Sequence, residues 1–158
     1  MANTQSMCTS FMGELMTATH NFGSAPTRAT SAVDSFKAAL YLTSATYDAA
    51  TTAYSSTGEV SGTGYTAGGV AVTMATVPTA TNSSATAGVA FVTPSASITY
   101  TTVTLTTAFD AVLLYNSTQS NKAVSVHTFG SQTITAGTFT LTMPSNTTST
   151  ALLRLATT

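Results

Sequence analysis

The sequence predicts an all-β protein, a two-sheet, jelly-roll-like β-sandwich with a short N-terminal helix or arm. Apolar residues alternate with small or polar residues from about residue 36 to the C-terminus, which is the period of a half-buried strand. Threonine and valine are frequent in these stretches, and their branched side chains suit a pleated surface. Turn-forming residues separate the stretches. A chain of 158 residues is long enough for one domain with a core of its own.

Residues 1–34 form a predicted N-terminal arm, and residues 35–158 form the predicted sandwich. A helix is expected from about residue 9 to residue 22, because Phe11, Leu15, Met16 and Phe22 fall on one helical stripe. Two packing arrangements fit this stripe: the arm packs on its own domain, or it docks on a neighbouring subunit. Residues 23–34 have the composition of a linker.

Eight strands are predicted in the sandwich, with turn signals between them. They span residues 36–42, 70–74, 89–92, 97–107, 109–115, 122–129, 138–143 and 152–155. The turn-rich residues 116–121 are expected to join their two flanking strands into a hairpin. Short antiparallel strands in this number are typical of a sandwich or a jelly roll.

The glycine-rich segment 58–69, with the sequence GEVSGTGYTAGG, predicts tight turns with positive φ. Its spacing of glycines has a superficial likeness to a dinucleotide-binding loop, but that loop requires a following helix and a strand pattern follows here. Glu59 is expected to accept backbone N–H bonds that hold the turn, or to lie at a subunit contact together with Tyr65.

Charge excludes several classes of function. Only 6% of residues are charged, the net charge is −1, and the four Lys and Arg residues are scattered, so neither a nucleic-acid groove nor a polybasic membrane segment is expected. The N-terminus has neither the basic nor the apolar region of a signal peptide, so synthesis in the cytoplasm is expected. Cys8, the single cysteine, is expected to be a free thiol.

No catalytic or metal-binding pattern is visible, so the sequence predicts neither an enzyme nor a bound cofactor. His20 and His127 have no second ligand at metal-site spacing, and no nucleophile-elbow motif surrounds any serine. His127 alternates with Ser125 and Phe129 and is expected to be a half-buried histidine with a hydrogen-bond partner. The five carboxylates are spread along the chain.

Several short stretches of the chain form a recognisable set, of which the segment 58–69 is the most specific. The others are ALY at 39–41, Tyr54, Thr57, AVLLYN at 111–116, KAV at 122–124, FG at 129–130 and GTFTL at 137–141. Together with the start of the chain and the predicted helix, which closes in His-Asn-Phe, they resemble a family of small virion proteins of tailed bacteriophages.

The resemblance implies a structural role in the virion. It favours a capsid decoration or cement protein on the capsid surface, a homotrimer that binds the major capsid protein and needs neither nucleic acid nor a membrane. The candidate subunit or capsid contacts are Phe11, Leu15, Met16, Phe22, Glu59 and Tyr65.

Two alternatives remain at this stage. A tail or head-fibre component would present an exposed aromatic patch for glycans, for example from Tyr47, Tyr54 and Tyr65. A virion-associated glycan hydrolase would require two acids to converge, with Asp110 or Glu59 as the first candidates.

Overall fold

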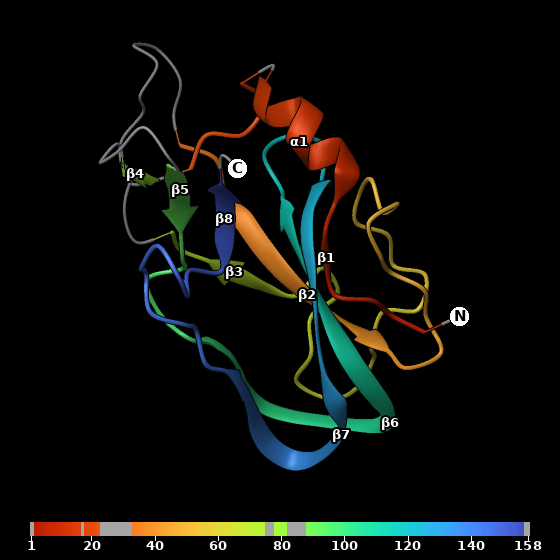
Figure 1. The fold of residues 1–158 in the computed structure, drawn as a ribbon. Helices are drawn as coiled ribbons and strands as arrows, with labels where there is room; N and C mark the ends of the chain where they lie inside the picture. The colour runs from red at the N-terminus through yellow and green to blue at the C-terminus, as the bar shows by residue number, and fades with distance from the viewer. Residues whose placement is uncertain (1, 17, 23–32, 75–77, 82–87, 157–158) are drawn as a thin grey trace.

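The computed structural model describes residues 2–16, 18–22, 33–74, 78–81 and 88–156, which form two antiparallel sheets and one short helix (Figure 1). The five-stranded sheet has the order β1-β7-β6-β2-β3, and the three-stranded sheet has the order β4-β5-β8. This arrangement confirms the predicted all-β class. The elements are β1 (Ser6–Met7), α1 (Thr9–Met16), β2 (Phe36–Leu42), β3 (Val70–Val72), β4 (Thr79–Thr81), β5 (Val89–Val92), β6 (Ile98–Asn116), β7 (Lys122–Leu141) and β8 (Leu153–Ala156).

The strands β6 and β7 form one long, bent hairpin that dominates the fold. The predicted strands 97–107 and 109–115 are one continuous strand, and so are 122–129 and 138–143. The pairing of β6 with β7 shifts register at five places, and such bulges bend a ribbon without ending it. The far half of the ribbon returns over β2, where the Tyr100 hydroxyl donates to the Ala38 carbonyl at 2.8 Å.

The bend encloses the hydrophobic core. Phe109, Phe129 and Phe139 meet in it with ring centroids 5.1–5.9 Å apart. Leu40 and Leu113, on the paired strands β2 and β6, are fully buried. Such burial of large apolar side chains is the main source of stability for a domain of this size.

The helix of the N-terminal arm is shorter than predicted, and the arm packs on its own domain. The expected helix 9–22 ends at Met16, because Ala18 adopts a φ of 53° and the backbone N–H of Thr19 returns to the Glu14 carbonyl at 2.9 Å. Before the helix, β1 pairs with β7. The described part of the arm therefore belongs to the core of this chain, and residues 23–32 of the predicted linker lie outside the described residues.

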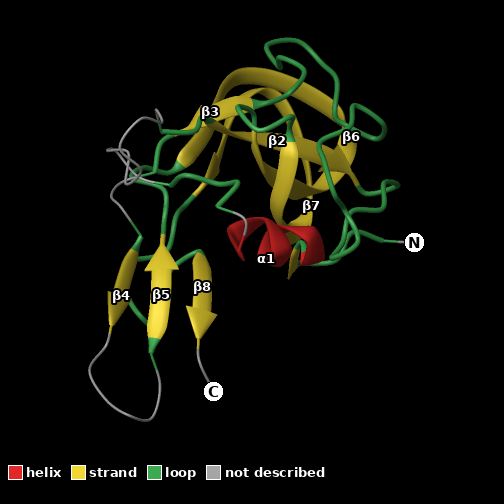
Figure 2. Ribbon diagram, turned by 90° about the horizontal axis from the view of Figure 1, so that it is seen from above, coloured by secondary structure: helices red, strands yellow, loops and turns green. Residues whose placement is uncertain are grey.

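The three-stranded sheet stands beside α1, as Figure 2 shows. Its central strand β5 pairs Val92 with Leu153 and Ala90 with Leu155 of β8. In the part of the chain that the structure describes, no helix has the length and apolar character needed to cross a membrane.

Candidate functional site

All five carboxylates of the chain accept hydrogen bonds from groups of the same chain. Asp110 accepts from the Asn3 amide at 2.6 Å, and Asp48 accepts from the backbone N–H of Ala50 at 2.8 Å. The other three, Glu14, Asp34 and Glu59, lie in two larger networks. These hydrogen bonds hold loops and the N-terminal arm in place.

Glu59 is the centre of the first network, which fixes the glycine-rich segment. Its Oε1 accepts from the Tyr65 hydroxyl and from the backbone N–H of Gly68, both at 2.7 Å, and its Oε2 accepts from the Tyr54 hydroxyl at 2.7 Å. The Tyr65 hydroxyl in turn accepts from the backbone N–H of Leu40 at 3.0 Å. Glu59 therefore accepts a backbone N–H that holds the turn, as the sequence predicts.

The tyrosines around Glu59 serve as hydrogen-bond donors. Burial raises the pKa of the Tyr54 and Tyr65 hydroxyls, and the hydrogen bonds to the Glu59 carboxylate raise it further. Burial also raises the pKa of Tyr100, and the Glu59 charge adds to that shift. These phenols stay protonated at neutral pH, so the arrangement contains no phenolate base.

The aromatic patch expected of a glycan-binding protein is not formed by Tyr47, Tyr54 and Tyr65. Tyr47 is buried, and its hydroxyl donates to the carbonyls of Ser55 and Thr57. Tyr54 stacks on Tyr115 with ring centroids 4.8 Å apart, and Tyr65 is half-buried with its hydroxyl on Glu59. The three rings pack into the domain instead of presenting a flat surface to solvent.

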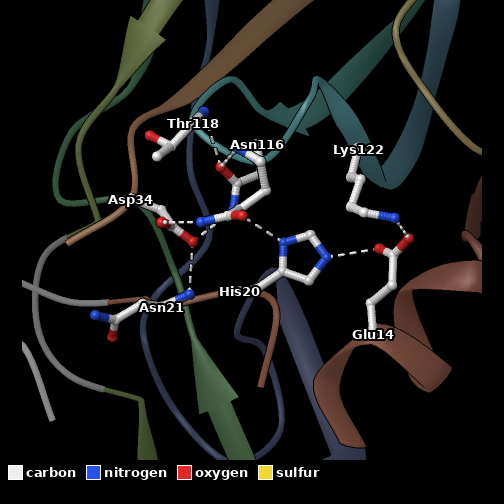
Figure 3. Close-up of polar contacts among 8 residues, drawn as sticks. Glu14, His20, Asn21, Asp34, Asn116, Thr118 and Lys122 are labelled. Carbon is white, nitrogen blue, oxygen red and sulfur yellow. Dashed lines mark hydrogen bonds and ion pairs between the residues drawn. The ribbon is translucent and has the colours of Figure 1, made fainter. Parts of the chain in front are cut away.

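The second network joins the N-terminal arm to the turn of the β6–β7 hairpin (Figure 3). Nε2 of His20 lies 2.8 Å from a Glu14 carboxylate oxygen, and Lys122 donates to the other oxygen at 2.5 Å. Hydrogen bonds from Lys122 and His20 lower the pKa of Glu14 against the opposing effect of desolvation. On its other side, Nδ1 of His20 lies 3.0 Å from the Asn116 amide nitrogen.

Asn116 determines which tautomer His20 adopts. The Asn116 side-chain oxygen accepts from the backbone N–H groups of Thr118 and Gln119, both at 3.1 Å, so its NH₂ group must face His20 and Asp34. His20 therefore accepts at Nδ1 and donates from Nε2 to Glu14. The imidazole is fully buried and has a partner on both nitrogens, which is the geometry of a structural histidine.

Asp34 closes the network where the chain enters β2. Its Oδ2 accepts from Asn116 at 2.7 Å and from the backbone N–H of Asn21 at 2.8 Å, and its own N–H donates to the Asn21 carbonyl at 3.2 Å. Sequence reasoning missed Asp34, Asn116 and Lys122. No local pattern marks them, because the side-chain contacts that join Asp34 to Asn116, Asn116 to His20 and Lys122 to Glu14 span 82 to 108 positions of sequence.

Cys8 and Ser125 are also buried, and His127 is partly exposed. Cys8 is a fully buried free thiol, and burial raises its pKa to about 11. The Ser125 hydroxyl and Nε2 of His127 lie 2.8 Å apart, so His127 has the expected hydrogen-bond partner. Within the described residues, no three His, Cys, Asp or Glu side chains come together as metal ligands.

An apolar groove lies between α1 and the three-stranded sheet, and three of the predicted contact residues meet there. Phe11, Leu15 and Phe22 line it from the arm, and Phe91 and Leu155 line it from the sheet. Phe11 and Phe22 are buried, whereas Leu155 is 42% exposed and the neighbouring Met12 on α1 is 49% exposed. Met16 closes the helix, and its side chain is not among those described.

Comparisons with known proteins found no matching family model, no similar curated protein and no similar solved structure.

Proposed function

We propose that this protein is a structural subunit of a bacteriophage virion, a capsid decoration or cement protein. In this role a homotrimer binds the outer face of the shell and stabilises contacts between major capsid subunits. The family resemblance of segment 57–69 supports the virion assignment. The observation that carries the structural role is the apolar groove beside α1, because it offers a surface for binding while the polar side chains serve the fold.

The distribution of charge supports the same proposal. Residues 128–153 contain no Asp, Glu, Lys or Arg, and this stretch includes much of β7 and the segment leading into β8. A surface with so few charges repels a second protein only weakly. For the same reason, the isolated subunit is expected to have low solubility. A subunit that functions within an assembly can tolerate both properties.

The internal networks fit a protein that must stay rigid while many copies bind at once. Glu59 holds the glycine-rich segment against β2, and the His20–Asn116 network holds the arm against the hairpin. A preorganised binding surface loses less conformational entropy on docking. Because decoration proteins act in many copies, even a modest contact area per subunit gives a large total stabilisation.

The first test is the copy number of this chain relative to the major capsid protein in purified particles, measured by quantitative mass spectrometry. A near-stoichiometric ratio supports a decoration or cement role. A ratio far below that assigns the protein to the tail or to a head fibre. Absence from particles would overturn the structural role.

The second test addresses the groove directly. Leu155→Glu places a charge at an exposed apolar position of the groove, and Met12→Glu places one on α1 next to the groove residue Phe11. The fold should survive in both, while binding to shells that lack the protein weakens about tenfold or more. Ser131→Glu is the matched control, because it adds the same charge at an exposed polar position on β7. Equal binding by all three variants would show that the groove is not the docking surface.

A further inference from the structure

Ser125 and His127 form a polar pair on the inner face of the five-stranded sheet. Cross-strand partners share a face, and β6 places Leu114 opposite Ser125 and Val112 opposite His127. Leu114 and Val112 are both buried. Ser125 is therefore buried among core side chains of the sheet, and His127 beside it is partly exposed; the pair lies away from the two networks that hold the loops.

Two cavities adjoin at this pair. The first has a volume of about 140 Å³ and is lined mainly by apolar side chains, among them Ile98, Val112, Leu114 and Leu141. The second, of about 190 Å³, is lined by residues of β1 and by Ser125. His127 and Leu152 line both, so the two cavities are neighbours at the imidazole, and together they are referred to below as the crevice.

The crevice is accessible from the surface at the segment that follows β7. Thr142 is exposed, and Thr128, Met143 and Leu152 are partly exposed along its rim. No Asp, Glu, Lys or Arg lines either cavity. A charged ligand would lose its hydration without gaining a partner, so the crevice selects against ions.

His127 provides one unused hydrogen-bonding position. Burial lowers its pKa to about 4, so the imidazole is neutral at physiological pH and carries one donor nitrogen and one acceptor nitrogen. Nε2 is bonded to Ser125, and among the described residues no group is bonded to Nδ1. None of the five carboxylates contacts His127, so the pair lacks the third member of a hydrolytic triad.

We propose that this crevice binds a small neutral aromatic molecule that carries one hydroxyl or amino group, with phenol as the simplest example. Apolar protein cavities of about 150 Å³ take up benzene, so the first cavity has the volume for one ring. The polar substituent of the ligand would exchange a hydrogen bond with the Ser125–His127 pair. This binding site is independent of the virion role proposed above.

The test is a titration of the full chain with phenol, followed by NMR of the His127 ring and of the Val112 and Leu114 methyl groups. The expected result is saturable one-to-one binding with contacts between phenol protons and those methyl groups. Benzoate, which has a similar shape and carries a charge, should not bind. No saturable shift of these signals up to about 10 mM phenol, a concentration that would reveal even millimolar affinity, would overturn the proposal.

The variant His127→Leu distinguishes the contribution of the hydrogen bond to phenol binding from the contribution of the apolar cavity. His127→Leu should weaken phenol binding about tenfold, which corresponds to about 1.4 kcal/mol, and should leave benzene binding within about threefold of the wild-type value. Equal loss of both ligands would contradict a role for the imidazole. If His127→Leu does not fold, Ser125→Ala replaces it as the test variant, because it frees Nε2 and keeps the imidazole. The change in the His127 ring shift on phenol binding must then differ between Ser125→Ala and the wild type for the proposal to stand.

Discussion

The Asn116 side chain donates a hydrogen bond to Nδ1 of His20 at 3.0 Å, across 96 positions of sequence. This bond ties the segment after α1 to the end of β6, and Asp34 accepts from the same amide nitrogen at 2.7 Å. One amide group therefore holds together three parts of the chain: the segment after α1, the segment before β2, and the end of β6. Because Asn116 is fully buried, every one of its polar atoms needs a partner, and the network supplies them all.

Asn116→Asp should destabilise the protein strongly at neutral pH. The substitution is nearly isosteric, but it replaces an NH₂ donor with a carboxylate beside the carboxylate of Asp34. We expect a loss of about 3 kcal/mol in the free energy of unfolding, measured by urea denaturation at pH 7. The loss should shrink as the pH falls, because a protonated carboxyl can donate again. Asn146→Asp, at an exposed position, is the control and should be nearly neutral.

Glu59→Ala should loosen the glycine-rich segment. It removes the acceptor for the Tyr54 and Tyr65 hydroxyls and for the Gly68 N–H. Leaving these groups without a partner should cost about 3 kcal/mol and should speed amide exchange in residues 58–69. Glu59→Gln keeps the Oε1 acceptor and should lose less than half as much. Similar losses for the two variants would mean that the negative charge of Glu59, and not the Oε1 acceptor alone, holds the segment.

Gly69→Ala tests the close contact between the glycine-rich segment and β2. Gly69 has a φ of +72°, and a Cβ at this position would lie 1.6 Å from the Ala38 carbonyl oxygen. Both the backbone conformation and the clash with main-chain atoms oppose a side chain, so we expect a loss of more than about 3 kcal/mol or failure to fold. Gly130→Ala is the control, because a Cβ added there would have no other atom within 4 Å. Its melting temperature should stay near the wild-type value.

The strands that could be predicted from the sequence are those whose burial leaves a local pattern. The bounds of β2 and β5 agree with the predicted strands 36–42 and 89–92. The predicted breaks inside β6 and β7 were wrong, because register shifts let a strand bend while its pairing continues. The strands β1 and β4 have only two and three residues, and their pairing partner defines them more than their own residues do.

The candidate sites also differ in whether the sequence could predict them, and the difference is how far apart the contacting residues lie in the sequence. The role of Glu59 could be predicted, because its partners Tyr65 and Gly68 lie 6 and 9 positions away in the same glycine-rich segment. The His20 network could not, because Asn116 is brought to it only by the hairpin. Local spacing carries no information about partners that the fold brings together.

His127→Leu should flatten the dependence of stability on pH between about pH 6.5 and pH 4. Burial lowers the pKa of His127 from its ordinary 6.5 to about 4 in the folded protein, so in this range the unfolded chain binds a proton that the folded chain does not. The stability of the wild-type protein therefore falls as the pH falls through this window, by about 3 kcal/mol in all, and this contribution stops changing below about pH 4.

Urea denaturation at half-unit pH intervals measures this slope in both proteins. The lowered pKa of Glu14 acts in the same direction, but its contribution is lost only below the ordinary value of 4.5, so the two groups act in different pH windows. The difference between wild type and His127→Leu should grow as the pH rises from 4 to 6.5 and then stay constant. Parallel stability curves across that window would show that His127 is protonated in the folded protein as readily as in the unfolded chain.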